Sequence, residues 1–101
     1  NNKKVDAKIK ADKIVLATGS SPVRLDIVGA NLEKVLTSTE MLNITEVPET
    51  LTIIGGGIIG MEFAFIFNSL GSDVTVVEFL DDILFTLDDD IIELIKGLIK
   101  V

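Results

Sequence analysis

A run of glycines between two apolar segments constrains the fold of this chain more than any other feature. Residues 51–54 are apolar and largely β-branched, which favours a buried β-strand. Gly55, Gly56 and Gly57 end that strand, and residues 58–70 are apolar on nearly every side, which predicts a buried helix. Gly71 marks the end of the helix, and residues 73–78 form a second apolar strand. The pattern predicts a βαβ unit with two parallel strands.

A second helix is expected after this unit. Three aspartates at positions 88–90 precede an amphipathic segment whose last apolar residue is Ile99, and Lys96 and Lys100 lie late in the segment. Acids at the start and cations at the end of a helix both interact favourably with its dipole. We therefore predict an α/β fold, a partial Rossmann-type domain with parallel βαβα order.

The first 24 residues have a different pattern. Val5, Ala7, Ile9 and Ala11 alternate with polar residues, which predicts a strand with one exposed face. Residues 13–17 are a short apolar run that ends at a turn over 18–22, which predicts a strand buried on both faces. Two strands are thus expected before the βαβα domain.

Residues 25–48 show no sustained period and read as a connector, with one helical turn around residues 38–42. The expected organisation is a first unit over residues 1–24, a connector over 25–48 and the start of the Rossmann-type domain over 49–101.

Composition excludes several functions. The chain has 101 residues with no cysteine and no histidine, so these residues contain no redox dithiol, no thiolate or imidazole zinc site and no imidazole base. The net charge of -7 argues against a nucleic acid partner. The longest apolar stretch, residues 51–67, contains three consecutive glycines and Glu62 and is shorter than a membrane span of about 20 residues. No membrane partner is expected. The polar first ten residues favour the cytoplasm.

Gly55, Gly57 and Gly60 fit the pattern G-x-G-x-x-G between a strand and a helix. This context is typical of dinucleotide binding: Gly55 permits the tight turn, Gly57 leaves room for a pyrophosphate, and Gly60 lets the helix approach the sheet. The unpaired N–H groups and the positive dipole end of the helix would compensate the charge of a diphosphate. An acidic chain could bind an anionic cofactor in this way.

Glu78 follows Gly57 by 21 positions, close to the spacing expected of the acid that binds the adenosine ribose. Such a carboxylate would repel a 2′-phosphate, and residues 79–86 contain no Lys or Arg, so NAD(H) is expected over NADP(H). The alternative is an ordinary solvated carboxylate. Glu62 is either a helix-start acid or a group that faces the cofactor. Phe63, Phe65, Ile66 and Phe67 are expected in the core.

Several motifs in order extend this interpretation. Residues 17–22, 37–40, 47–48, 55–62, and 70–71 with 74–78, resemble the middle of the flavoprotein pyridine nucleotide-disulfide oxidoreductases, and the resemblance covers essentially the whole chain. It implies that Thr18, Gly19 and Ser20 lie against FAD at the end of an FAD-binding domain; by themselves they indicate only a strand end. It also implies that Glu62 lies near the nicotinamide and that Glu78 binds the ribose. The residues implied to line the NAD site are Gly55, Gly56, Gly57, Ile58, Ile59, Gly60, Met61 and Glu62.

The resemblance also implies an activity. It is electron transfer from a dihydrolipoyl dithiol through a protein disulfide and FAD to NAD+, with a lipoyl-bearing protein or a small disulfide as partner and a homodimeric parent. The redox cysteines and the His-Glu base of the family are not among these residues, so an internal segment is expected. Lack of basic residues after the second strand favours a lipoamide-type member. The alternatives are the NAD module of a mercuric, coenzyme A-disulfide or glutathione reductase or of another dehydrogenase, and a non-catalytic interaction fragment.

Overall fold

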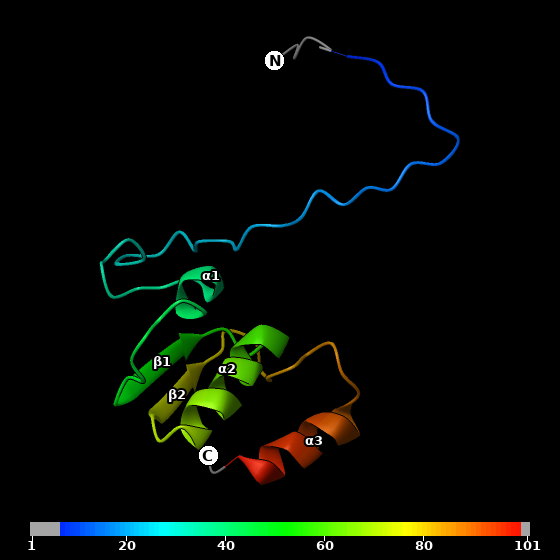
Figure 1. The fold of residues 1–101 in the computed structure, drawn as a ribbon. Helices are drawn as coiled ribbons and strands as arrows, with labels where there is room; N and C mark the ends of the chain where they lie inside the picture. Colours follow the sequence, from blue (N-terminus) through cyan, green and yellow to red (C-terminus); the bar gives the residue numbers. More distant parts are fainter. Residues whose placement is uncertain (1–6, 100–101) are drawn as a thin grey trace.

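The computed structural model describes residues 7–99. Three helices and two strands lie between residues 38 and 98, in the order α1, β1, α2, β2, α3 (Figure 1). Their bounds are α1 Ser38–Met41, β1 Thr50–Ile54, α2 Ile58–Ser69, β2 Asp73–Val77 and α3 Asp89–Leu98. The expected order of strand, helix, strand and helix from residue 50 onward is confirmed.

The two strands form a parallel sheet. Leu51 pairs with Val74 and Ile53 with Val76, in a register that joins the two strands along their whole length. The N–H of Gly55 donates to the carbonyl of Val77 at 2.8 Å and continues the ladder into the glycine run. The α/β class and the parallel βαβ unit are therefore confirmed.

The core lies between α2, the sheet and α3. Met61 and Ala64 of α2, Leu84 of the loop and Ile92 of α3 are buried together, and Ile53 of β1 packs against them with other half-buried side chains. The amphipathic pattern of α3 explains why one of its faces enters this cluster. Among residues 7–99, no helix is both long enough and apolar enough to cross a membrane.

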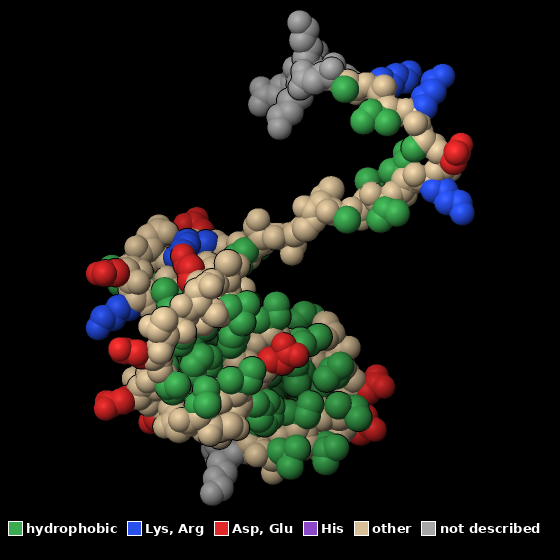
Figure 2. Space-filling model, in the orientation of Figure 1, with side chains coloured by type: hydrophobic (Ala, Val, Ile, Leu, Met, Phe, Trp, Pro, Cys, Tyr) green, Lys and Arg blue, Asp and Glu red, His purple; other side chains and the backbone are tan. Residues whose placement is uncertain are grey.

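The prediction that α2 is buried on every side is wrong for this chain. Phe67 is buried and Phe63 is half-buried, but Phe65 is 42% exposed and Ile66 is 53% exposed. Only one side of α2 faces the sheet and α3, and the described residues provide no second layer. Hydrophobic side chains therefore cover much of the visible surface of the folded part (Figure 2).

The two strands expected before residue 25 are also not found among the described residues. Residues 7–24 contain no strand, and the segment extends away from the sheet (Figure 1). Ile14 is 75% exposed, and Val15 and Leu16 are each 87% exposed. A strand must pair its backbone groups with a neighbouring strand, and the described residues provide no such partner for residues 7–17. Val5 of the first expected strand lies outside the described residues.

The connector contains the expected helical turn, α1, and Arg24, the residue just before the connector, contacts both this turn and the chain that leads to it. The guanidinium of Arg24 donates to the carbonyl of Ala30 at 2.7 Å and to both carboxylate oxygens of Glu40 at 3.2 Å. Glu40 also accepts the N–H of Thr37 at 2.6 Å. The hydrogen bond from Thr37, followed by the charge of Arg24, lowers the pKa of Glu40 below its usual value.

Candidate functional site

The glycine bend (residues 55–57) lies at the carboxyl end of β1, where β1 leads into α2. Gly55 has a φ of +110°, a left-handed conformation that only glycine adopts without strain. A Cβ on Gly60 would lie 2.1 Å from the carbonyl oxygen of Gly55, so α2 approaches the end of the strand as closely as a glycine permits. The tight turn and the close helix contact have the geometry that the sequence predicts.

Gly57 is the open position of the bend. It precedes the first residue of α2 in an extended conformation, and a Cβ placed on it would meet no atom within 4 Å. The first hydrogen bond of the helix runs from the N–H of Met61 to the carbonyl of Gly57 at 2.9 Å. The N–H groups of residues 58–60 therefore have no partner within the helix, and they lie at the positive end of its dipole. An anion at this end would meet polarised donors.

Gly56 has a different environment from Gly57. Its N–H donates to Oε2 of Glu78 at 2.6 Å, and its carbonyl accepts the N–H of Leu84 at 2.8 Å. A Cβ on Gly56 would lie 2.7 Å from Cγ2 of Ile83. The sequence placed Gly56 among the residues that line the cofactor, but the structure places protein atoms beside it.

Glu78 directs its carboxylate at the glycine bend. Besides the bond from Gly56, its Oε1 accepts the N–H groups of Phe79 at 2.7 Å and Leu80 at 2.8 Å. These bonds, with Leu80 the largest cause and Gly56 the next, hold the pKa of Glu78 below its usual value, so the side chain is ionised at neutral pH. A carboxylate has about four acceptor positions, and three are occupied. One acceptor position remains for a ligand hydroxyl.

The other candidate residues, in the first turns of α2, differ in their exposure. Ile58 and Ile59 are more than half exposed, and Glu62, the sole charged residue of α2, is also exposed. Met61 is only 4% exposed and belongs to the core, so its side chain does not line an open site. Its backbone N–H is used within the helix.

The candidate FAD residues are not brought to this site. Thr18, Gly19 and Ser20 are exposed and lie in the segment that extends away from the sheet (Figure 1). Gly19 has a φ of +71° and no atom within 4 Å of its Cβ position. A wide groove of about 1380 Å³ runs along β1 from the connector to Gly57, and these three residues do not border it.

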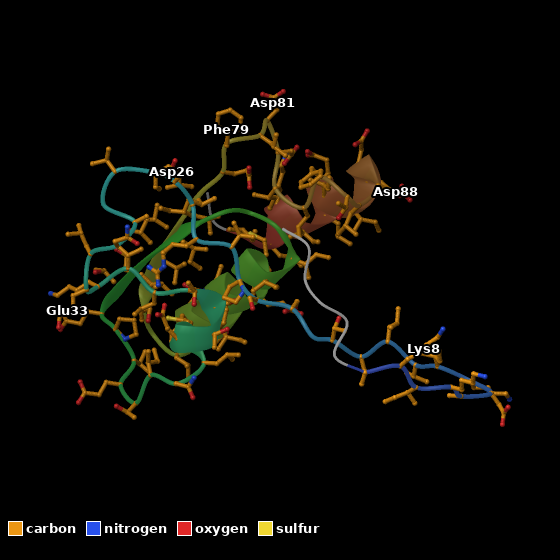
Figure 3. All side chains as sticks on the ribbon, turned by 90° about the horizontal axis from the view of Figure 1, so that it is seen from above. Lys8, Asp26, Glu33, Phe79, Asp81 and Asp88 are labelled. Atoms are coloured by element: carbon orange, nitrogen blue, oxygen red, sulfur yellow. The ribbon has the colours of Figure 1, made fainter. Side chains whose placement is uncertain are left out.

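The segment after β2 carries negative charge at its outer side. Phe79 and Asp81 lie at the outer edge of the molecule, where Phe79 is 98% exposed (Figure 3). Lys96 of α3 donates to Asp82 at 2.5 Å and to Glu93 at 3.0 Å. The hydrogen bond between them raises the pKa of Lys96 and lowers that of Asp82. Lys96, the cation of α3 that contacts this segment, is therefore paired with two carboxylates.

Sequence reasoning missed two residues that contact the glycine bend. Nothing in the pattern indicates that Ile83 packs on Gly56 or that the N–H of Leu84 reaches its carbonyl. The nearest signal in the sequence was the run of three successive glycines. Gly56 is not among the glycines with a positive φ, so its own backbone conformation does not explain why position 56 is a glycine.

Comparison with known proteins identifies the family. The family model for pyridine nucleotide-disulphide oxidoreductases matches residues 1–100. A dihydrolipoyl dehydrogenase of Acholeplasma laidlawii is 49% identical over 87 residues, which are 82% of this chain and 26% of that protein. One from Trypanosoma brucei brucei is 41% identical over 103 residues, covering 99% of this chain and 22% of that protein. One from Bacillus subtilis (strain 168) is 39% identical over 87 residues, covering 86% and 19%. The chain thus spans about a quarter or less of the length of these relatives, and it belongs to the pyridine nucleotide-disulphide oxidoreductase family.

Proposed function

We propose that residues 49–101 form the first part of the NAD(H)-binding domain of a flavin-dependent dihydrolipoyl dehydrogenase, and that residues 1–24 form the end of its FAD-binding domain. Membership of the family implies NAD(H) and FAD as cofactors, and the relatives above carry the name dihydrolipoyl dehydrogenase. The observation that carries the proposal is the open position at Gly57, directly before the unpaired amides of α2. The residues at the bend suit a diphosphate.

The diphosphate would bind at Gly57. Its backbone can be approached because a Cβ there would meet nothing within 4 Å, and the N–H groups of residues 58–60 supply donors. The dipole of the twelve-residue helix α2 adds a favourable potential without any Lys or Arg. In contrast, Gly60 would act indirectly by holding the helix against Gly55.

The adenosine ribose would bind at Glu78. The ionised carboxylate has one acceptor position free of backbone donors, which suits a ribose hydroxyl. A 2′-phosphate would meet this carboxylate with Asp81 and Asp82 nearby in sequence and no cation between residues 79 and 86. These charges favour NAD(H) over NADP(H).

The rest of the activity would come from other parts of the protein. NAD+ would be the final acceptor of the two electrons released when a dihydrolipoyl dithiol closes to its disulfide, with FAD between them. The 101 residues contain no cysteine or histidine to carry the thiol chemistry. Thr18, Gly19 and Ser20 would contact FAD, Glu62 would lie on the nicotinamide side, and a lipoyl-bearing protein would be the substrate of a homodimeric parent.

Substitution of Gly57 by aspartate tests the diphosphate site in the whole protein. Aspartate is a favoured residue before the first turn of a helix, so Gly57→Asp should leave thermal stability unchanged or slightly higher. Its charge would repel the diphosphate, and we expect the NADH dissociation constant from calorimetry to rise by about tenfold or more.

The matched control is Gly97→Asp, which adds the same charge at an exposed glycine of α3 whose Cβ position is equally open. Its NADH affinity should stay within about twofold of the unmodified protein, because residue 97 lies near the C-terminal end of α3 and not at the bend. Equal NADH affinity for Gly57→Asp and Gly97→Asp would contradict the proposed site.

A further inference from the structure

Gly56 is bonded on both sides to groups that follow β2. Its N–H donates to Oε2 of Glu78, the residue after β2, at 2.6 Å. Its carbonyl accepts the N–H of Leu84 at 2.8 Å. Residues 79–88, here called the β2–α3 segment, are therefore attached to the glycine bend through one residue. The single backbone donor of Gly56 is thus bonded to a protein carboxylate, and its carbonyl already accepts one protein N–H.

The need for glycine at position 56 is steric. A Cβ would lie 2.7 Å from Cγ2 of Ile83 and 3.3 Å from Oε2 of Glu78. Gly56 is not among the positive-φ glycines, so its backbone conformation is open to alanine. Gly57, the next residue, has no atom within 4 Å of its Cβ position. Within one glycine run, position 56 thus faces protein and position 57 faces open space.

Leu84 donates the hydrogen bond to the carbonyl of Gly56, and its backbone conformation is unusual. Its φ is +52°, the left-handed region that leucine adopts uncommonly. Its side chain is 6% exposed and packs with Met61, Ala64 and Ile92. Conformations of this kind persist where the surrounding packing enforces them, and they are frequent at ligand sites. Burial of the side chain therefore fixes the backbone that directs the N–H of Leu84 at Gly56.

The orientation of Glu78 depends on this attachment. Its Oε1 is held locally by Phe79 and Leu80, and its Oε2 is held by Gly56. We propose that Leu84 is a positioning residue: its left-handed backbone attaches the β2–α3 segment to Gly56, and the attachment orients the Glu78 carboxylate that discriminates NAD(H) from NADP(H). This inference rests on the proposed function and adds the residue that holds the selective carboxylate in position.

Two valine substitutions in one cluster separate backbone conformation from packing. Leu84→Val and Ile92→Val each remove one methylene from the same buried cluster. Valine is β-branched and strongly disfavours the left-handed region, whereas position 92 lies in the helix α3. The readout is the ratio of the NADPH and NADH dissociation constants of the whole protein. We expect Leu84→Val to lower this ratio by about tenfold and Ile92→Val to leave it within about twofold.

A second pair of variants approaches the same contact from Gly56. Gly56→Ala would push against Ile83 and should lower the NADPH to NADH ratio as Leu84→Val does. Adding Ile83→Ala removes the Cγ2 atom that lies 2.7 Å from the new Cβ and should restore most of the ratio. A merely destabilising cavity at Ile83 would not restore selectivity. This pair decides the question if Leu84→Val does not fold.

The outcomes separate the two proposals. If neither Leu84→Val nor Gly56→Ala changes the ratio while Gly57→Asp still weakens NADH binding, Leu84 does not position Glu78 and the proposed function stands. If Ile92→Val lowers the ratio as much as Leu84→Val, packing alone is responsible and the inference is wrong. If the unmodified protein binds no NADH, the proposed function fails, and the selectivity role assigned to Leu84 falls with it.

Discussion

Oε2 of Glu78 accepts a 2.6 Å hydrogen bond from the backbone N–H of Gly56, which precedes it by 22 residues. The bond joins the end of β2 to the turn after β1, so the groups proposed for ribose and diphosphate recognition belong to one connected unit. Parallel pairing of Ile54 with Val77 explains why these two ends meet, since parallel strands end at the same edge of a sheet.

Exchange of the acid at position 78 should change nucleotide preference. Glu78→Ala removes the negative charge, and Phe79→Arg adds a cation at a side chain that is 98% exposed. We expect the double variant to shift the ratio of NADPH to NADH dissociation constants by about tenfold toward NADPH. Phe79→Arg alone, with Glu78 retained, is the control and should shift it less. Unchanged preference in the double variant, measured by calorimetry, would refute the ribose role.

The pH dependence of stability follows from the lowered pKa of Glu78. The amide hydrogen bonds from Leu80, Gly56 and Phe79 lower it below its ordinary value of 4.5. A folded pKa below the unfolded value means that the ionised group stabilises the fold fully above pH 4.5, and that this contribution is lost as the pH falls through the lowered value. The difference in melting temperature between the unmodified protein and Glu78→Gln should thus be constant from about pH 8 to about pH 5 and shrink at more acid pH. A difference that already disappears between neutral pH and pH 5 would show that Glu78 is not held this way.

Gly60 and Gly97 should respond oppositely to alanine. A Cβ at Gly60 would lie 2.1 Å from a backbone oxygen, so α2 must move, and we expect Gly60→Ala to lower the free energy of unfolding by about 1 to 3 kcal/mol. At Gly97 of α3 the Cβ position is open, and Gly97→Ala should raise the free energy of unfolding by up to about 1 kcal/mol because alanine is the better helix former. Chemical denaturation measures both. A Gly60→Ala protein as stable as the unmodified one would contradict the close approach.

The connector should depend on Arg24. Its guanidinium donates to the carbonyls of Ala30 and Val35 and to the carboxylate of Glu40, so Arg24→Ala leaves three acceptors without their donor. We expect subtilisin to cleave the native variant several-fold faster within residues 25–40, because this segment would open locally more often. Lys34→Ala, at an exposed cation of the same segment, is the comparison and should not accelerate cleavage. Equal cleavage rates in the two variants would mean that Arg24 does not hold the connector.

The sequence predicts the elements from residue 50 onward because their signals are local. The strand patterns, the glycine run and the acidic start of α3 place each element within two residues of its observed bounds. Strands over residues 5–11 and 13–17 were predicted from equally clear patterns, but the described part, residues 7–17, forms none, because a strand depends on neighbours that the described residues do not provide. One side of α2 is exposed for the same reason: the described residues include no layer that covers it.

The candidate site was predictable at Gly55, Gly57 and Gly60, where the pattern follows from backbone geometry. Its second part was not, because it depends on contacts between distant residues. A leucine gives no signal for a left-handed backbone, so the φ of +52° at Leu84 is visible only in the structure. The same holds for the contact of Ile83 with Gly56, which distinguishes two adjacent glycines that look equivalent in the sequence.

A crystal structure of the whole protein with NAD+ bound tests the central claim most directly. We predict diphosphate oxygens within about 3 Å of the backbone nitrogens at the start of α2, beside Gly57, and a ribose hydroxyl hydrogen-bonded to Glu78 while Glu78 keeps its bond to Gly56. A dinucleotide bound with its diphosphate away from Gly57, or with Glu78 turned from the ribose, would contradict the account.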